Sequence, residues 1–69
     1  MLEEKFDKRF GYVAIENGFI TRDQLIEALK VQLAEELQGM EHRLIGNILQ
    51  TKEYMTYSQT DEVLKLMGV

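Results

Sequence analysis

The segment at residues 17–29, NGFITRDQLIEAL, constrains the fold most, because it carries the signals that end one helix and begin another. Gly18 follows apolar residues at helical spacing and suits the left-handed conformation that ends many helices. Thr21 has the side chain of an N-cap, and Gln24 completes a capping box with it. Ile20 and Leu25 flank this cap as a hydrophobic staple, which fixes the direction of the second helix. The segment therefore predicts the turn of a helical hairpin.

The pattern of this turn recurs 35 residues further along the chain. At that offset the corresponding pairs are Gly11 and Gly46, Ile20 and Met55, Thr21 and Thr56, Gln24 and Gln59, and Leu29 and Leu64. The echo predicts two helical hairpins, over about residues 3–38 and 41–67, within a single domain spanning residues 1–69. No stretch alternates with the period of a strand for more than a few residues. The predicted fold is an all-α bundle of about four helices.

The second predicted helix, from Arg22 to about Leu37, is apolar on more than one side. Its inner face is expected to consist of Leu25, Ala28, Leu29, Leu33 and Leu37. Ile26 and Val31 lie off that stripe, so they need a separate reason to be apolar. Either the second hairpin covers them, or they form an interaction surface for a protein partner or for a second copy in a homodimer.

Composition excludes several classes of function. The 69 residues include no cysteine, so the chain has neither disulfides nor thiolate metal ligands. The net charge of −4 is spread evenly, and no basic stripe is present to bind duplex nucleic acid. No apolar run is long enough for membrane insertion and no signal peptide is evident, so a cytoplasmic location is expected.

The residue types that carry catalysis are scarce. His42 is the single histidine and Ser58 the single serine, and a nucleophilic site needs more than these two can supply. The carboxylates, including Asp7, are expected on the polar faces of the helices. The sequence therefore predicts a protein that is not an enzyme and has neither a metal site nor a cofactor.

Residues 9–32, RFGYVAIENGFITRDQLIEALKVQ, contain a motif that ends in Leu-x-x-Ala-Leu-x-x-Gln. The residues that fall in register with it are Arg9, Gly11, Ile15, Gly18, Ile20, Leu25, Ala28, Leu29 and Gln32. In these residues the chain resembles the N-terminal domains of the ATPases of type II secretion and type IV pilus assembly. The resemblance implies a helical fold and a bacterial source.

In one branch of that family, two such motifs in tandem bind cyclic di-GMP. The resemblance implies ligand-binding roles for Arg9, Phe10, Gly11 and Gln32. An arginine can pair with guanine or phosphate oxygens, a glycine lets the backbone approach, and a glutamine can pair with a base edge. Helical rise places Arg9 and Gln32 at similar heights on antiparallel helices, so the geometry permits their side chains to converge on one ligand.

A structural interpretation competes with each of these ligand roles. Arg9 and Gln32 would then be solvated or cap neighbouring helices, and Gly11 would allow close helix packing. The sequence thus predicts a non-enzymatic helical module for protein interaction or regulation. A receptor domain for cyclic di-GMP is the alternative.

Overall fold

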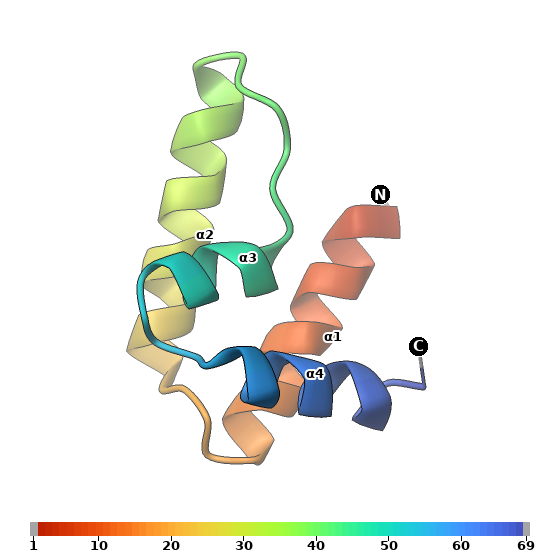
Figure 1. The fold of residues 1–69 in the computed structure, drawn as a ribbon. Helices are drawn as coiled ribbons and strands as arrows, with labels where there is room; N and C mark the ends of the chain where they lie inside the picture. Colours follow the sequence, from red (N-terminus) through yellow and green to blue (C-terminus); the bar gives the residue numbers. More distant parts are fainter. Residues whose placement is uncertain (1, 69) are drawn as a thin grey trace.

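The computed structural model describes residues 2–68, and within this range it contains four helices and no strand (Figure 1). The helices are α1 (Leu2–Glu16), α2 (Arg22–Leu37), α3 (Ile45–Thr51) and α4 (Tyr57–Leu66). The predicted all-α bundle is therefore confirmed. Across the same residues, no helix has the length and apolar character that crossing a membrane requires.

The turn between α1 and α2 forms as predicted. Gly18 has a φ of 73°, and the backbone N–H of Phe19 donates to the carbonyl of Ala14 over 3.0 Å. The Thr21 hydroxyl accepts from the backbone N–H of Gln24 at 3.1 Å, and the Gln24 side chain accepts from the N–H of Thr21 at 2.9 Å. Both halves of the capping box are thus present, and carbonyl groups in the last turn of α1 accept hydrogen bonds from the turn that follows.

The second repeat reproduces this turn, although the glycine that ends the first helix is replaced. Thr56 and Gln59 form the same reciprocal capping box at the start of α4. At the position equivalent to Gly18, however, Glu53 occupies the left-handed region with a φ of 64°. The second repeat therefore keeps the backbone geometry of the turn without the glycine, and Glu53 adopts a strained conformation there.

Packing between the repeats holds the bundle together. α3 lies between α1 and α2 in Figure 1, and α2 packs chiefly against α3, whereas α1 contacts both α3 and α4. The core consists of Phe10, Ala14, Ile20, Leu25, Ala28, Ile45, Ile48, Leu49, Met55 and Val63. The two predicted hairpins thus have the expected order and turns, but each is splayed open, and the other repeat enters it.

Two glycines permit the closest approaches between elements. A Cβ on Gly11 would lie 2.7 Å from a methyl carbon of Leu25, and a Cβ on Gly46 would lie 2.9 Å from the ring of Phe10. Such distances are too short for real contacts, so both positions depend on the missing side chain. Gly11 therefore has a packing role where α1 and α2 come together.

The predicted inner face of α2 is wrong for three of its five residues. Leu25 and Ala28 are buried as expected, but Leu29, Leu33 and Leu37 are exposed to 39%, 59% and 79%. These leucines lie on a side of α2 that points away from its buried residues, and the end of α2 also extends past the other helices (Figure 1). The third buried residue of α2 is instead polar, Gln32.

Candidate functional site

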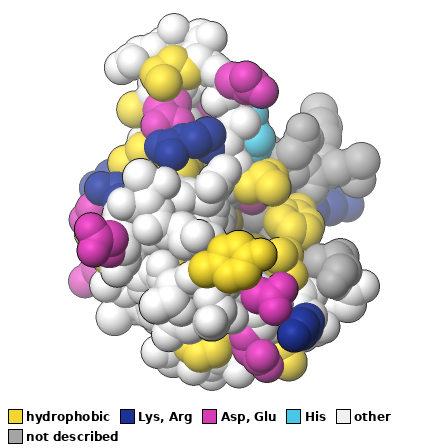
Figure 2. Space-filling model, in the orientation of Figure 1, with side chains coloured by type: hydrophobic (Ala, Val, Ile, Leu, Met, Phe, Trp, Pro, Cys, Tyr) yellow, Lys and Arg dark blue, Asp and Glu magenta, His cyan; other side chains and the backbone are white. Residues whose placement is uncertain are grey.

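The main exposed feature of the described residues is an apolar stripe on the solvent side of α2, formed by Ile26, Leu29, Leu33 and Leu37. We call it the α2 outer face. Its members recur at intervals of three and four residues, so they share one side of the helix. At 3.6 residues per turn, this side points about 110° away from the buried residues of α2. Figure 2 shows hydrophobic side chains over the projecting C-terminal half of α2.

The loop of residues 38–44 supports this projecting half from the opposite side. Arg43 donates to both carboxylate oxygens of Glu35, over 3.0 and 2.6 Å. This bidentate contact lowers the pKa of the Glu35 carboxyl and raises the pKa of Arg43. At the next residue of α2, a carboxylate oxygen of Glu36 lies 2.7 Å from Nδ1 of His42. The Arg43–Glu35 ion pair and the His42–Glu36 contact therefore fix the loop to α2 and leave the outer face uncovered.

The N-terminal half of α2 is tied to the turn between α3 and α4. The Tyr54 hydroxyl donates to Glu27 over 2.7 Å, and the Lys52 ammonium lies 2.9 Å from the same oxygen. Hydrogen bonds from Lys52 and then Tyr54 lower the pKa of Glu27. These contacts lie beside the outer face and form one of its polar borders.

A buried cluster of polar side chains, which the sequence did not lead us to expect, connects α1, α2 and α3. Asp7 was expected on the surface, but it is 3% exposed. One of its oxygens accepts from the Gln32 amide nitrogen at 2.7 Å, and the other accepts from the backbone N–H of Ile45 at 3.1 Å. Nε2 of His42 lies 3.6 Å from Asp7. Asp7 therefore caps α3 from another helix, because the N-cap residue, Leu44, has no side chain that can accept.

Asp7 and the main chain already engage the Gln32 amide. Besides the bond to Asp7, its nitrogen donates to the carbonyl of Arg43 over 2.8 Å. Among buried side chains of the described residues, no nitrogen or oxygen lacks a hydrogen-bond partner. The polar group is thus complete without a ligand, and its arrangement is that of a structural connection between α1, α2 and α3.

The four residues expected to bind cyclic di-GMP do not share a surface. Arg9 is exposed, whereas Phe10 is 2% exposed within the core. Gly11 lies against Leu25, and the Gln32 amide is engaged as described above. In this conformation Arg9 alone presents its functional group to solvent. Arg9 and Gln32 therefore do not converge, because Gln32 turns inward to Asp7 while Arg9 is exposed.

The predicted interaction surface of Ile26 and Val31 is also divided. Ile26 is 44% exposed and belongs to the α2 outer face, but Val31 is half-buried and packs against the core. Two residues that are five apart on a helix point in different directions, so one partner surface cannot use both equally. The exposed leucines, rather than Val31, are the neighbours of Ile26.

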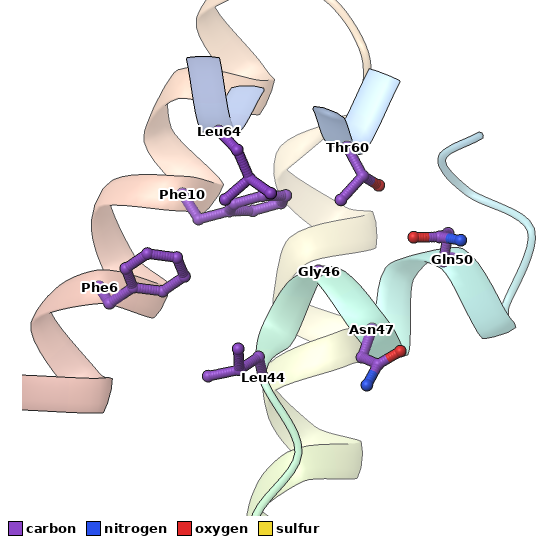
Figure 3. Close-up of a pocket in the computed structure, with 8 residues that line it drawn as sticks. All are labelled: Phe6, Phe10, Leu44, Gly46, Asn47, Gln50, Thr60 and Leu64. Carbon is purple, nitrogen blue, oxygen red and sulfur yellow. The ribbon is translucent and has the colours of Figure 1, made fainter. Parts of the chain in front are cut away.

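A second candidate is a small pocket between α1, α3 and α4, with a volume of about 180 Å³. Figure 3 shows its lining, which comprises Phe6, Phe10, Leu44, Gly46, Asn47, Gln50, Thr60 and Leu64. The repeat explains its origin. In the first repeat Leu25 fills the space beside Gly11. In the second repeat the ring of Phe10 lies against Gly46, and the shorter Thr60, at the position equivalent to Leu25, lines the pocket. The pocket is therefore a place where the second repeat lacks a leucine.

Among the side chains described in residues 5–68, no group of three or more His, Asp and Glu is arranged to hold a metal ion. His42 faces Glu36 and Asp7, while Ser58 is exposed in the first turn of α4, on another part of the chain. Comparisons with protein-family models, with curated proteins and with solved structures find no match to this chain. The resemblance to secretion ATPase domains thus rests on the motif in residues 9–32.

Proposed function

We propose that this chain is a non-enzymatic protein-interaction module that binds its partner through the α2 outer face. The observation that carries the proposal is the exposure of Leu33 and Leu37, at 59% and 79%, beside Ile26 and Leu29 on one side of a helix. A contiguous exposed apolar patch on a small domain is typical of an interaction site. Apolar residues at intervals of three and four along one helix are the pattern with which a helix binds an apolar groove or another helix.

The contacts around α2 support the same proposal. Glu35 and Glu36 hold the loop of residues 38–44, and Glu27 holds the turn before α4, so α2 is fixed from two sides. A helix fixed in this way can present leucines without collapsing them into the core. We propose further that the module is related to the N-terminal domains of secretion and pilus ATPases, a relation that depends on the motif alone.

The test compares the same substitution on two faces of one helix. Leu33→Ser should change the free energy of unfolding by no more than about 0.5 kcal/mol, because the side chain is exposed. Leu25→Ser, the matched control, should lower it by about 3 kcal/mol, because Leu25 is 7% exposed and contacts Gly11. Urea denaturation followed by circular dichroism measures both. Equal losses would mean that Leu33 is a core residue, and the proposed surface would not exist.

A photo-crosslinking side chain at position 33 tests for a bound protein directly. The proposal expects crosslinked products in cells that express the chain, and none when the same group replaces Leu66, which is exposed on α4. Identical products from the two positions would indicate nonspecific contact and would contradict the proposal.

The alternative, a receptor for cyclic di-GMP, is supported by the motif and by the exposure of Arg9. It requires the buried hydrogen bond between Gln32 and Asp7 to break, so the free energy of that bond would be subtracted from the free energy of binding. Calorimetry with cyclic di-GMP tests it. Heat that disappears in Arg9→Ala would favour the receptor, and no heat up to high micromolar concentrations would exclude it.

A further inference from the structure

We infer that the partner of the α2 outer face is a second copy of this chain, with the two α2 helices packed antiparallel. This inference rests on the proposed function. The face complements itself when one helix is reversed about a two-fold axis near residue 31. In that register Leu29 lies opposite Leu33 of the second copy, and Ile26 lies opposite Leu37 of the second copy. All four apolar residues of each copy then meet an apolar partner.

The charge of Arg22 favours this orientation. Arg22 and Asp23 are both exposed in the first turn of α2, and the exposed carboxylates of Glu36 and Glu41 lie near its end. An antiparallel pair brings Arg22 of each copy toward the acidic end of the other, and it also opposes the two helix dipoles. A parallel pair would place the acidic ends side by side, where they repel each other.

The shape of the molecule permits the contact. The C-terminal half of α2 projects beyond the other helices, and the loop of residues 38–44 lies on its inner side (Figure 1). A second copy can therefore approach the outer face without meeting the rest of the bundle. Sixteen residues give a helix of about 24 Å, so the pair buries less than the roughly 1,600 Å² of a standard interface. The dimer is therefore expected to be weak and reversible, with a dissociation constant in the micromolar range.

Sedimentation equilibrium over a range from about 10 to about 500 µM tests the dimer. The parent chain should shift from the monomer mass toward twice that mass. Leu33→Glu should weaken this association at least about tenfold, because it places two carboxylates near the two-fold axis. Leu66→Glu is the matched control, since Leu66 is exposed to a similar degree on α4, and it should leave the association unchanged.

Disulfide trapping tests the orientation, because the chain contains no cysteine of its own. Ile26→Cys and Leu37→Cys should each give little covalent dimer alone, since equal positions lie far apart in an antiparallel pair. Mixing the two variants under oxidising conditions should give abundant dimer, because positions 26 and 37 then face each other. Dimers from each variant alone, with no gain on mixing, would show a parallel pair and overturn the proposed geometry.

Failure of this inference can be distinguished from failure of the proposed function. A parent chain that stays monomeric at every concentration, while Leu33→Glu keeps the thermal stability of the parent, would exclude the second copy. The outer face would then remain a surface for another protein. Loss of helix content in Leu33→Glu but not in Leu66→Glu would instead show that Leu33 is internal, and both proposals would fall together.

Discussion

Removal of the Asp7 carboxylate should destabilise this protein more than removal of any exposed acid. In Asp7→Ala, the backbone N–H of Ile45 loses its acceptor at the buried start of α3, and the Gln32 amide loses one of its two acceptors. A buried donor without a partner costs about 1–3 kcal/mol. The two losses together, eased in part by water that enters the space, should lower the free energy of unfolding by about 2–4 kcal/mol. Chains of this length have a total stability of only about 3–10 kcal/mol, so the loss removes a substantial part of it and should clearly lower the melting temperature.

Urea denaturation at several temperatures measures this loss, and two further variants give it a scale. Asp61→Ala removes an exposed carboxylate that pairs with Lys65 on α4, and it should cost no more than about 0.5 kcal/mol. Asp7→Asn should lie between the two, because its amide oxygen can still accept from Ile45 while its amide nitrogen faces the donor of Gln32. If Asp7→Ala is as stable as Asp61→Ala, the cap that we assign to Asp7 contributes nothing, and the reasoning is refuted.

Three other predictions concern the turns, the pocket and pH. Positions 18 and 53 both have a positive φ, so Glu53→Gly should stabilise the protein by about 0.5–1 kcal/mol and Gly18→Val should destabilise it by at least about 1 kcal/mol. Thermal melts measure both changes, and changes of the same sign in the two variants would contradict this prediction. Thr60→Leu should fill the pocket between α1, α3 and α4 and raise the free energy of unfolding by about 0.5–1.5 kcal/mol. A lower melting temperature would instead show that the pocket has no room for the larger side chain. Because Arg43 lowers the pKa of Glu35, the stability from this pair is present above the pKa of the unfolded carboxyl, near 4.3, and is lost as pH falls through the lower pKa of the folded state. In thermal melts at graded pH, Glu35→Gln should therefore lose less stability than the parent between about pH 5 and pH 3. Equal losses in the two proteins would argue against the pair.

Local signals in the sequence sufficed for the turns. The boxes at Thr21 and Thr56 and the left-handed Gly18 depend on residues within a few positions of each other, and all three form as predicted. Such patterns carry their own physical cause, because each donor and acceptor belongs to the same turn of chain.

The side of α2 that faces the core could not be predicted in the same way. Helical spacing shows that Leu29, Leu33 and Leu37 share a side, but it does not show which side meets the core. The buried position of Gln32 decides this, since its amide reaches Asp7, which is 25 residues away in the sequence. That pairing depends on tertiary structure, and no local pattern announces it.

One signal for Asp7 was nevertheless present. The helix that begins at Ile45 follows Leu44, an apolar residue that cannot accept a hydrogen bond at its cap. A buried helix start without a local cap needs an acceptor from elsewhere in the chain. Acids on otherwise apolar helix faces are the candidates for that acceptor, and Asp7 lies between Phe6 and Phe10 on α1.

The position of α3 between α1 and α2 also fixes how many repeats this architecture can hold. In a solenoid, each repeat packs on an open end of the previous one, so the array can gain or lose units. Here each repeat instead enters the opening of the other, and the pair closes on itself (Figure 1). A third unit would find no vacant opening, and a lone unit would leave its own opening empty. This fold therefore cannot be extended by adding further copies of the repeat. A change in the packing surface of one repeat requires a matching change in the other.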